Sequence, residues 1–202
     1  MIKIGVVSRI DKTQNNNVYV FNKELCDYLI KKNIEIIPII SYDENLIKMC
    51  DGFILPGGDS KTIDFLIIKY CLEYNIPLLG ICLGMQSIGE YFNGEIVSVS
   101  NHYSKDRYIH SIEIDNKSLL YKIIKSMHIT VNSRHHDKLI NPNIFVSAYS
   151  SDGVIEAIED QSKTFIVGVQ WHPESMIDYD IIQVRLIDRF IDACKGDNNE
   201  FI

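Results

Sequence analysis

Several features that would place the chain in a special class are missing from its 202 residues. Charged residues make up only 23% and apolar residues reach 46%, a balance that excludes disordered and collagen-like classes. No apolar run approaches the roughly 20 residues that cross a bilayer, so we expect no membrane-spanning segment. The net charge is −7 and the sequence has no basic stripe. Nucleic acid is therefore not an expected partner.

Cysteine is sparse and lacks metal-binding spacing. The five cysteines form an odd set without a Cys-x-x-Cys pair, which favours reduced thiols over a disulfide framework or a zinc site. They are Cys26, Cys50, Cys71, Cys82 and Cys194. Residues 1–9 have too short an apolar run for a signal peptide and no small-residue cleavage site, so they predict a first strand. We expect a cytoplasmic protein.

Strands and helices alternate through the first half of the sequence. Short apolar runs predict strands at residues 2–7, 34–40, 52–55 and 77–81, and helical spacing predicts helices at 21–29, 61–74 and 83–92. This order is typical of a parallel sheet with helices on both faces. The second half is richer in short strands, predicted at 95–99, 108–114, 128–131, 144–148, 154–158 and 165–170, before a final helix from about Asp180. With no linker composition along it, the chain predicts a single domain over residues 1–202.

The most distinctive motif is Gly80-Ile-Cys-Leu-Gly84 between a predicted strand and a predicted helix. Its spacing is that of a nucleophile held on a sharp strand-to-helix turn, where glycines avoid collisions with neighbouring segments. Cys82 would lie at a helix N-terminus, whose dipole favours the thiolate. The alternative is a small buried cysteine next to glycines that only let the helix pack on the sheet. The other four cysteines have no such setting.

A candidate base follows the last predicted strand. His172 comes directly after the apolar run 165–170 and so lies at the carboxyl edge of the sheet, the edge that also carries Cys82. His172 can exchange the thiol proton, and Glu174 can accept a hydrogen bond from the other ring nitrogen. An ordinary polar residue at a strand end is the alternative interpretation of His172.

Glycine-rich residues after the strand at 52–55 could support negative charge. Gly57 and Gly58 let the backbone approach a ligand closely. An N–H group there and the N–H of Leu83 could together hold a developing oxyanion. A plain β-turn would have the same sequence.

The segment Val131-Asn-Ser-Arg-His-His-Asp137 gathers polar side chains behind another strand. Adjacent residues on an extended chain point in opposite directions, so His135 and His136 do not predict a metal site, and we expect no metal. Substrate recognition and a solvated loop both remain open. Arg134 suits a carboxylate, but the sequence does not show where it points.

These motifs, taken in order along the chain, resemble the class I glutamine amidotransferase-like superfamily and, within it, the peptidase C26 group of γ-glutamyl hydrolases. The resemblance rests on residues 55–59, 80–86, 131–136, 152–158 and 168–174 and covers nearly the whole chain. We therefore expect an α/β fold with a flavodoxin-like, open and mostly parallel sheet, helices on both faces, and added antiparallel strands in the C-terminal half.

The resemblance also implies roles for individual residues. It gives Cys82 as nucleophile with His172 and Glu174 as partners, and Gly58 and Leu83 as oxyanion donors. It implies that Gln86 and the backbone around Ser133, Arg134 and His135 hold a γ-glutamyl group, next to Gly57. No role follows for His136 or Asp137. No cofactor is expected.

The function expected from these residues is hydrolysis of a γ-glutamyl amide bond through a γ-glutamyl thioester. A second hypothesis is a glutaminase subunit that supplies ammonia to a separate synthetase chain. A third is a non-catalytic binding protein on the same scaffold. In each case the ligand is a small γ-glutamyl compound or glutamine, and the amine that leaves is not readable from the sequence.

Overall fold

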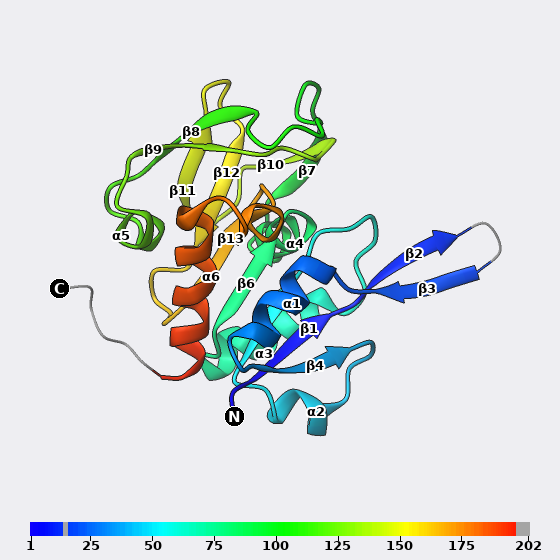
Figure 1. The fold of residues 1–202 in the computed structure, drawn as a ribbon. Coiled ribbons are helices and arrows are strands. Elements are labelled where there is room, and N and C mark those ends of the chain that lie inside the picture. The colour runs from blue at the N-terminus through cyan, green and yellow to red at the C-terminus, as the bar shows by residue number, and fades with distance from the viewer. Residues whose placement is uncertain (14–15, 197–202) are drawn as a thin grey trace.

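A nine-stranded sheet forms the centre of the computed structural model, which describes residues 1–13 and 16–196 (Figure 1). Its strand order is β4-β1-β5-β6-β13-β12-β11-β8-β9. The strands are β1 (Lys3–Val7), β4 (Glu35–Ile39), β5 (Gly52–Leu55), β6 (Leu78–Ile81), β8 (His110–Ile114), β9 (His128–Val131), β11 (Phe145–Ser150), β12 (Ile155–Glu159) and β13 (Ile166–Val169). The strands from β4 to β13 pair in parallel, and those from β13 to β9 pair antiparallel. The α/β fold and the added antiparallel strands are thus confirmed.

Within the described residues, six α-helices and one short 3₁₀ helix surround this sheet. They are α1 (Lys23–Lys31), α2 (Glu44–Lys48), α3 (Asp64–Tyr74), α4 (Leu83–Tyr91), α5 (Leu119–Ile124), η1 (Pro173–Met176) and α6 (Ile181–Cys194). Among the described residues, none of these helices is long and apolar enough to cross a membrane.

Two apolar cores lie on opposite faces of the parallel strands. Alternate residues of a strand belong to different cores, as in β5. Ile54 belongs to the core that also contains residues of α1, α5 and α6, while Phe53 and Leu55 belong to the core that contains residues of α2, α3 and α4. This alternation follows from the period of two along a strand. Both faces are buried, which explains why the strands are apolar along their whole length.

Side-chain caps fix where several helices begin. Asn22 accepts a hydrogen bond from the backbone N–H of Leu25, so α1 begins at Lys23. Asp180 caps α6 in the same way, and this helix begins where the sequence predicted. Helix α3 begins at Asp64, three residues later than expected. The reason is tertiary, because the Asp64 carboxylate is used by a buried arginine described below.

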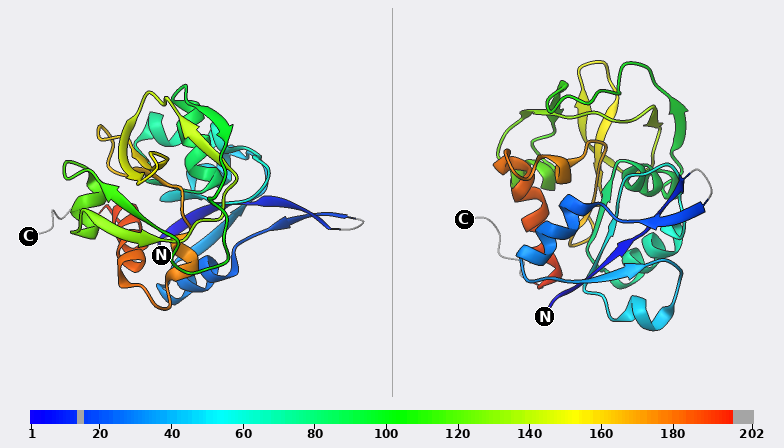
Figure 2. Two further views of the ribbon diagram at one scale, coloured as in Figure 1. Left: turned by 90° about the horizontal axis from the view of Figure 1, so that it is seen from above. Right: turned by 45° about the vertical axis from the view of Figure 1, so that its right-hand side comes forward.

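Several elements were not expected from the sequence. A two-stranded hairpin of β2 (Arg9–Thr13) and β3 (Asn16–Val20) projects from the body of the protein (Figures 1 and 2). Every residue of β3 whose exposure is described is exposed, so no alternation of apolar and polar residues marks this strand. A second small sheet pairs β7 (Glu95–Ser98) with the unexpected β10 (Asp137–Ile140). The short helices α2 and α5 were also missed.

Candidate active site

Four loops meet at the carboxyl edge of the parallel strands. The strands β1, β5, β6 and β13 are neighbours in the sheet and run in the same direction. Their carboxyl ends lead into Arg9, the Gly57–Gly58 turn, Cys82 and His172. Loops at this edge of an open α/β sheet are the usual position of a ligand site. The strand order thus places Cys82 and His172 on the same edge of the sheet, as the sequence predicted.

Cys82 lies on a strained turn between β6 and α4. Its backbone has φ 51° and ψ −104°, a positive φ that a non-glycine residue rarely adopts. A side chain at Gly84 would lie 2.0 Å from the carbonyl oxygen of Leu55, and one at Gly80 would lie 2.8 Å from the backbone of Gly84. The glycines therefore have the steric role that the sequence predicted. The turn presents the Cys82 side chain at the edge of the sheet.

Cys82 and His172 both pack against Gly57. A Cβ atom placed on Gly57 would lie 2.6 Å from Cε1 of His172 and 3.3 Å from Cβ of Cys82. Because Gly57 has no side chain, Cys82 and His172 can both occupy the space next to it. From the other side, the Gln170 amide donates to Sγ of Cys82 at 3.6 Å. The structure thus brings the expected nucleophile, the expected base and the glycine turn together.

Glu174 orients the His172 ring. Nδ1 of His172 lies 2.7 Å from Oε1 of Glu174, whose side chain is buried. A carboxylate can only accept here, so the proton is on Nδ1 and the opposite nitrogen, Nε2, is left for other partners. Burial lowers the pKa of His172, but the charge of Glu174 and hydrogen bonding with Cys82 and Glu174 outweigh it and raise the pKa to about 10.

Removing the carboxylate charge should therefore lower the pKa of His172. We expect the Glu174→Gln protein to lose a proton from His172 at lower pH than the unchanged protein, which an NMR titration of the imidazole protons would measure. Because the folded pKa is above the ordinary 6.5, the pairing stabilises the fold fully below about pH 6.5, and this contribution disappears as the pH rises through about 10. The variant should show a weaker loss of unfolding free energy over that interval. An unchanged titration would show that Glu174 does not control the charge of His172.

A buried ion pair holds the glycine turn in place. The Arg9 guanidinium donates to both carboxylate oxygens of Asp64, at 2.6 and 2.9 Å, and twice to the carbonyl oxygen of Pro56, at 2.9 and 2.7 Å. Ser87 Oγ donates to the same carboxylate at 2.7 Å. The stem of Arg9 also packs against Gly58, whose φ of 152° is open to glycine. Sequence reasoning missed Arg9 and Asp64, because a single arginine after a strand carries no recognisable signal.

A pocket of about 450 Å³ lies beside the site, and its lining includes His172 and Glu174 but not Cys82. Gly57, Gly58, His172 and Arg134 all contribute to its lining. Nη1 of Arg134 donates to Oγ of Ser175 at 3.0 Å, which fixes the guanidinium at the wall of the pocket. The structure thus places Arg134 on the wall of the pocket, where its guanidinium contacts Ser175, and its contact with substrate stays a prediction.

The other expected substrate residues, Gln86, Ser133 and His135, are buried and are not among the residues that line this pocket. The Gln86 amide is buried and donates to the carbonyl oxygen of Asp137 at 3.1 Å and to Gln170 at 3.2 Å. Ser133 is buried, and its hydroxyl donates to the His102 carbonyl oxygen at 2.6 Å. Burial lowers the pKa of His135 to about 4. A contact of these residues with substrate stays a prediction.

The two residues without an expected role also have positions. The ring of His136 stacks on Tyr103, with 4.7 Å between ring centroids. The carbonyl oxygen of Asp137 accepts from Gln86 and from Nδ1 of His135, at 3.1 and 2.9 Å. Asp137 therefore links the helix that follows Cys82 to the segment around His135.

The remaining cysteines differ from Cys82 in their surroundings. All five are free thiols. Burial raises the pKa of Cys50 to about 11, and it raises the pKa of Cys71 and Cys194 as well. Such buried thiols are poor nucleophiles near neutral pH.

Comparisons with known proteins agree with this geometry. The model of the Peptidase C26 family matches residues 59–174, more than half of the chain. The γ-glutamyl-γ-aminobutyrate hydrolase of Escherichia coli is 26% identical over 75% of this chain and 75% of its own length. A glutamine amidotransferase-like protein of Rickettsia prowazekii is 26% identical over 74% and 79%. The crystal structure of a glutamine amidotransferase from Thermotoga maritima superposes with a TM-score of 0.71 at 14% identity, covering 96% of this chain and 97% of that one.

Proposed function

The chain belongs to the peptidase C26 family, and on that premise we propose that it is a cysteine hydrolase that cleaves γ-glutamyl amide bonds. The observation that carries the proposal is the meeting of Cys82 and His172 on either side of Gly57, with His172 bound to Glu174. Acyl transfer needs a nucleophile, a base within reach and a group that orients the base. Here Cys82 is the nucleophile and His172 is the base, and both lie next to Gly57. Glu174 orients the His172 ring.

The reaction proceeds in two steps. In the first, His172 takes the thiol proton of Cys82 on Nε2, the sulfur attacks the γ-carbonyl carbon, the C–N bond breaks, and His172 gives this proton to the departing amine, which leaves a γ-glutamyl thioester. In the second, His172 takes a proton from water and the resulting hydroxide attacks the thioester carbon. The C–S bond then breaks, His172 returns the proton to the sulfur, and glutamate leaves. No cofactor enters either step.

Backbone N–H groups stabilise the charge that develops on the carbonyl oxygen. Leu83 is the first residue of α4, and such N–H groups have no carbonyl one turn earlier to accept them. Gly58 lines the pocket. We propose its N–H and that of Leu83 as the oxyanion donors, and each such donor typically contributes about 3 kcal/mol to transition-state stabilisation.

Arg134 is proposed to bind the α-carboxylate of the γ-glutamyl group. Replacing it with methionine should raise KM about 10- to 100-fold and change kcat little, because a charge-assisted hydrogen bond far from the breaking bond is lost in both ground and transition states. Steady-state kinetics with a γ-glutamyl amine measures both constants. Arg185→Met, at an exposed position of α6, is the matched control. A fall in kcat alone would contradict this role.

The leaving amine faces the base of the β2–β3 hairpin. Ile10, Val20 and Phe21 line the pocket together with the polar residues Asp11 and Asn22. A pocket with apolar side chains beside the reacting bond supports an amine that is larger than ammonia. A panel of γ-glutamyl amines and free glutamine, scored by glutamate release, tests the proposal. Turnover of γ-glutamyl amines by the chain alone is expected. Turnover of glutamine only, and only with a synthetase chain present, would favour the subunit hypothesis instead.

The cytoplasmic location and the single-domain organisation expected from the sequence remain predictions.

A further inference from the structure

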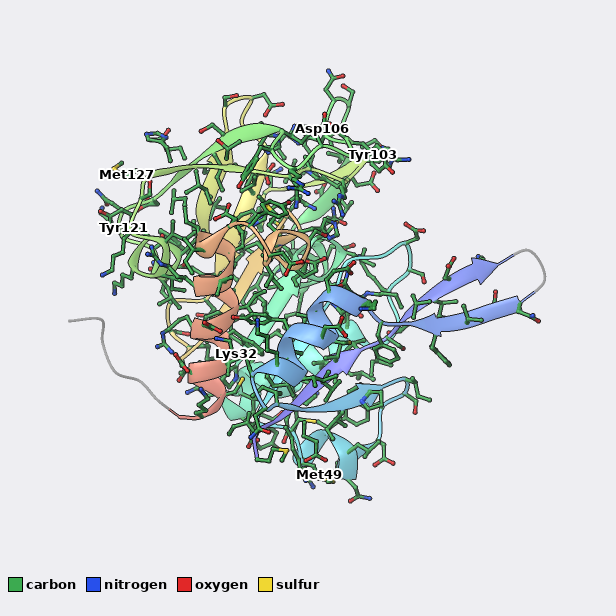
Figure 3. The ribbon with its side chains drawn as sticks, in the orientation of Figure 1. Lys32, Met49, Tyr103, Asp106, Tyr121 and Met127 are labelled. Atoms are coloured by element: carbon green, nitrogen blue, oxygen red, sulfur yellow. The ribbon has the colours of Figure 1, made fainter. Side chains whose placement is uncertain are left out.

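Three histidines and one glutamate meet inside the C-terminal half of the protein, away from the catalytic pocket. We call His102, His110, His135 and Glu156 the inner histidine cluster. Glu156 is on β12, His110 begins β8, His135 lies between β9 and β10, and His102 lies in the loop after β7. That loop is at the top of Figure 3, where its residues Tyr103 and Asp106 are labelled. The side chains of His102, His135 and Glu156 are at most 3% exposed, and that of His110 is 16% exposed.

A ring nitrogen of each histidine in this cluster lies within 4 Å of the Glu156 carboxylate. Oε1 of Glu156 lies 3.0 Å from Nε2 of His110, 3.7 Å from Nδ1 of His102 and 3.9 Å from Nε2 of His135. The rings of His102 and His110 have centroids 5.0 Å apart, and those of His102 and His135 are 4.8 Å apart. None of the three nitrogens, and neither carboxylate oxygen of Glu156, has a hydrogen-bond partner within the described part of the chain. Buried polar atoms without partners are costly, so five of them at one point require an explanation.

The ring nitrogens that face away from Glu156 determine whether the nitrogens that face Glu156 carry a proton. Nε2 of His102 lies 3.0 Å from Oδ2 of Asp152, and Nδ1 of His135 lies 2.9 Å from the carbonyl oxygen of Asp137. Both partners can only accept, so each ring donates outward and, in its neutral form, turns a lone pair inward toward the Glu156 carboxylate. Lone pairs that face a carboxylate repel it unless a proton or a metal cation lies between them. A proton on His110 can serve Glu156 at 3.0 Å, but it leaves the inner nitrogens of His102 and His135 without a partner. Histidines that donate outward to a carboxylate or a carbonyl group are also characteristic of metal ligands.

The separations suit a small metal ion. With bonds of about 2.0 to 2.1 Å, the ligand atoms around a tetrahedral Zn²⁺ lie about 3.3 Å apart. The three oxygen-to-nitrogen distances in the cluster lie on either side of that value. Ligand atoms of His102, His110 and Glu156 lie within 4.8 Å of one another. Imidazole donors favour zinc over Mg²⁺ or Ca²⁺, which prefer oxygen ligands.

We propose that His102, His110 and Glu156 bind one Zn²⁺ ion in a structural site, with the His135 ring packed beside it. The ion would replace the repulsion among the inner atoms with three bonds to the protein and would join β8, β12 and the loop after β7. The neighbouring segment around His135 carries Arg134 and Asn132, and the Asn132 amide makes two hydrogen bonds of 2.8 Å with the backbone of His172. The metal would therefore stiffen the segment that borders the catalytic pocket without taking part in the reaction.

This proposal departs from the expectation of no metal, which rested on the opposite directions of His135 and His136 and on the lack of a further Cys/His/Asp cluster at ligand spacing. The proposed ligands come from three segments that are separated along the chain, so no ligand spacing appears in the sequence. It is also independent of the proposed hydrolase activity, because no member of the inner histidine cluster lines the pocket.

The test uses the full chain as a Cys82→Ala protein without an affinity tag, so that the catalytic thiol cannot hold the metal. After chelator treatment and dialysis, Zn²⁺ is titrated against a chromophoric competitor, and Co²⁺ is added separately to record its visible spectrum. We expect one Zn²⁺ per chain, a Co²⁺ spectrum typical of tetrahedral nitrogen and oxygen ligands, and a higher midpoint of thermal unfolding with zinc.

Variants identify the ligands. His110→Gln and Glu156→Gln should each weaken zinc binding at least about 100-fold, and the exposed Asp152→Asn should weaken it about 10- to 100-fold by releasing the His102 ring. His128→Gln, at an exposed histidine on β9, is the matched control and should change nothing. A folded parent protein that takes up no zinc overturns the proposal. So does zinc binding that stays unchanged in Asp152→Asn and His110→Gln, since neither depends on loss of the fold.

Discussion

Replacing Cys82 with alanine should lower kcat/KM for γ-glutamyl amines by at least about 10⁴-fold. The thioester cannot form without the sulfur, and what remains is the smaller acceleration from binding and from the oxyanion donors. Alanine fits the site, because the turn at Cys82 is shaped by Gly80, Gly84 and the backbone rather than by the thiol. Glutamate release under single-turnover and steady-state conditions measures the loss.

The control separates loss of the nucleophile from loss of any thiol. Cys26→Ala changes a partly exposed cysteine of α1, so its activity should equal that of the unchanged protein. Circular dichroism and the midpoint of thermal unfolding should be the same for both variants. Activity of Cys82→Ala within tenfold of the unchanged protein would remove the proposed mechanism.

Replacing Asp64 with alanine should lower the free energy of unfolding by about 3 to 5 kcal/mol. This change leaves the Arg9 guanidinium buried and without its carboxylate partner, and breaking a buried ion pair from one side costs about that much. In a protein of this size the midpoint of thermal unfolding should fall by roughly 6 to 20 °C. Calorimetry or urea unfolding followed by fluorescence measures the change.

Two comparisons test whether the burial of the pair causes the effect. Asp27→Ala breaks an exposed pair with Lys23 and should have no measurable effect on unfolding. The double variant Arg9→Met with Asp64→Leu removes both charges and should regain much of the lost stability. It should still lose activity, because nothing then holds the carbonyl oxygen of Pro56 and the glycine turn behind it. Full activity in the double variant would show that Arg9 does not position this turn.

Elements that bury a face of a sheet were predictable from the sequence. The strands β1, β5, β6 and β13 are continuously apolar because both of their faces are covered, and this pattern placed their carboxyl ends on one edge. That placement is enough to predict that Cys82, His172 and the Gly57–Gly58 turn meet. The glycines around Cys82 were informative because each lies where a side chain would collide with backbone.

Elements without such a signal were not predictable. Strand β3 is exposed, and β10 pairs only with β7, so neither repeats an apolar residue at every second position over a long run. Helix α5 has six residues and is held by its Ser118 cap and by Glu159, which accepts from its first N–H groups at 2.7 and 3.2 Å. Long-range contacts of this kind, like the Arg9–Asp64 pair and the inner histidine cluster, join residues that are far apart in the chain.

The most direct test of the account is to find where the γ-glutamyl group is attached during turnover. The protein is mixed with excess γ-glutamyl amine, quenched in acid within the first turnovers, digested and analysed by mass spectrometry. We predict one γ-glutamyl group on the peptide that contains Cys82, and none on any peptide of the Cys82→Ala protein. Turnover without a modified Cys82, or a γ-glutamyl group on another residue, would contradict the claim that Cys82 and His172 form the reacting pair.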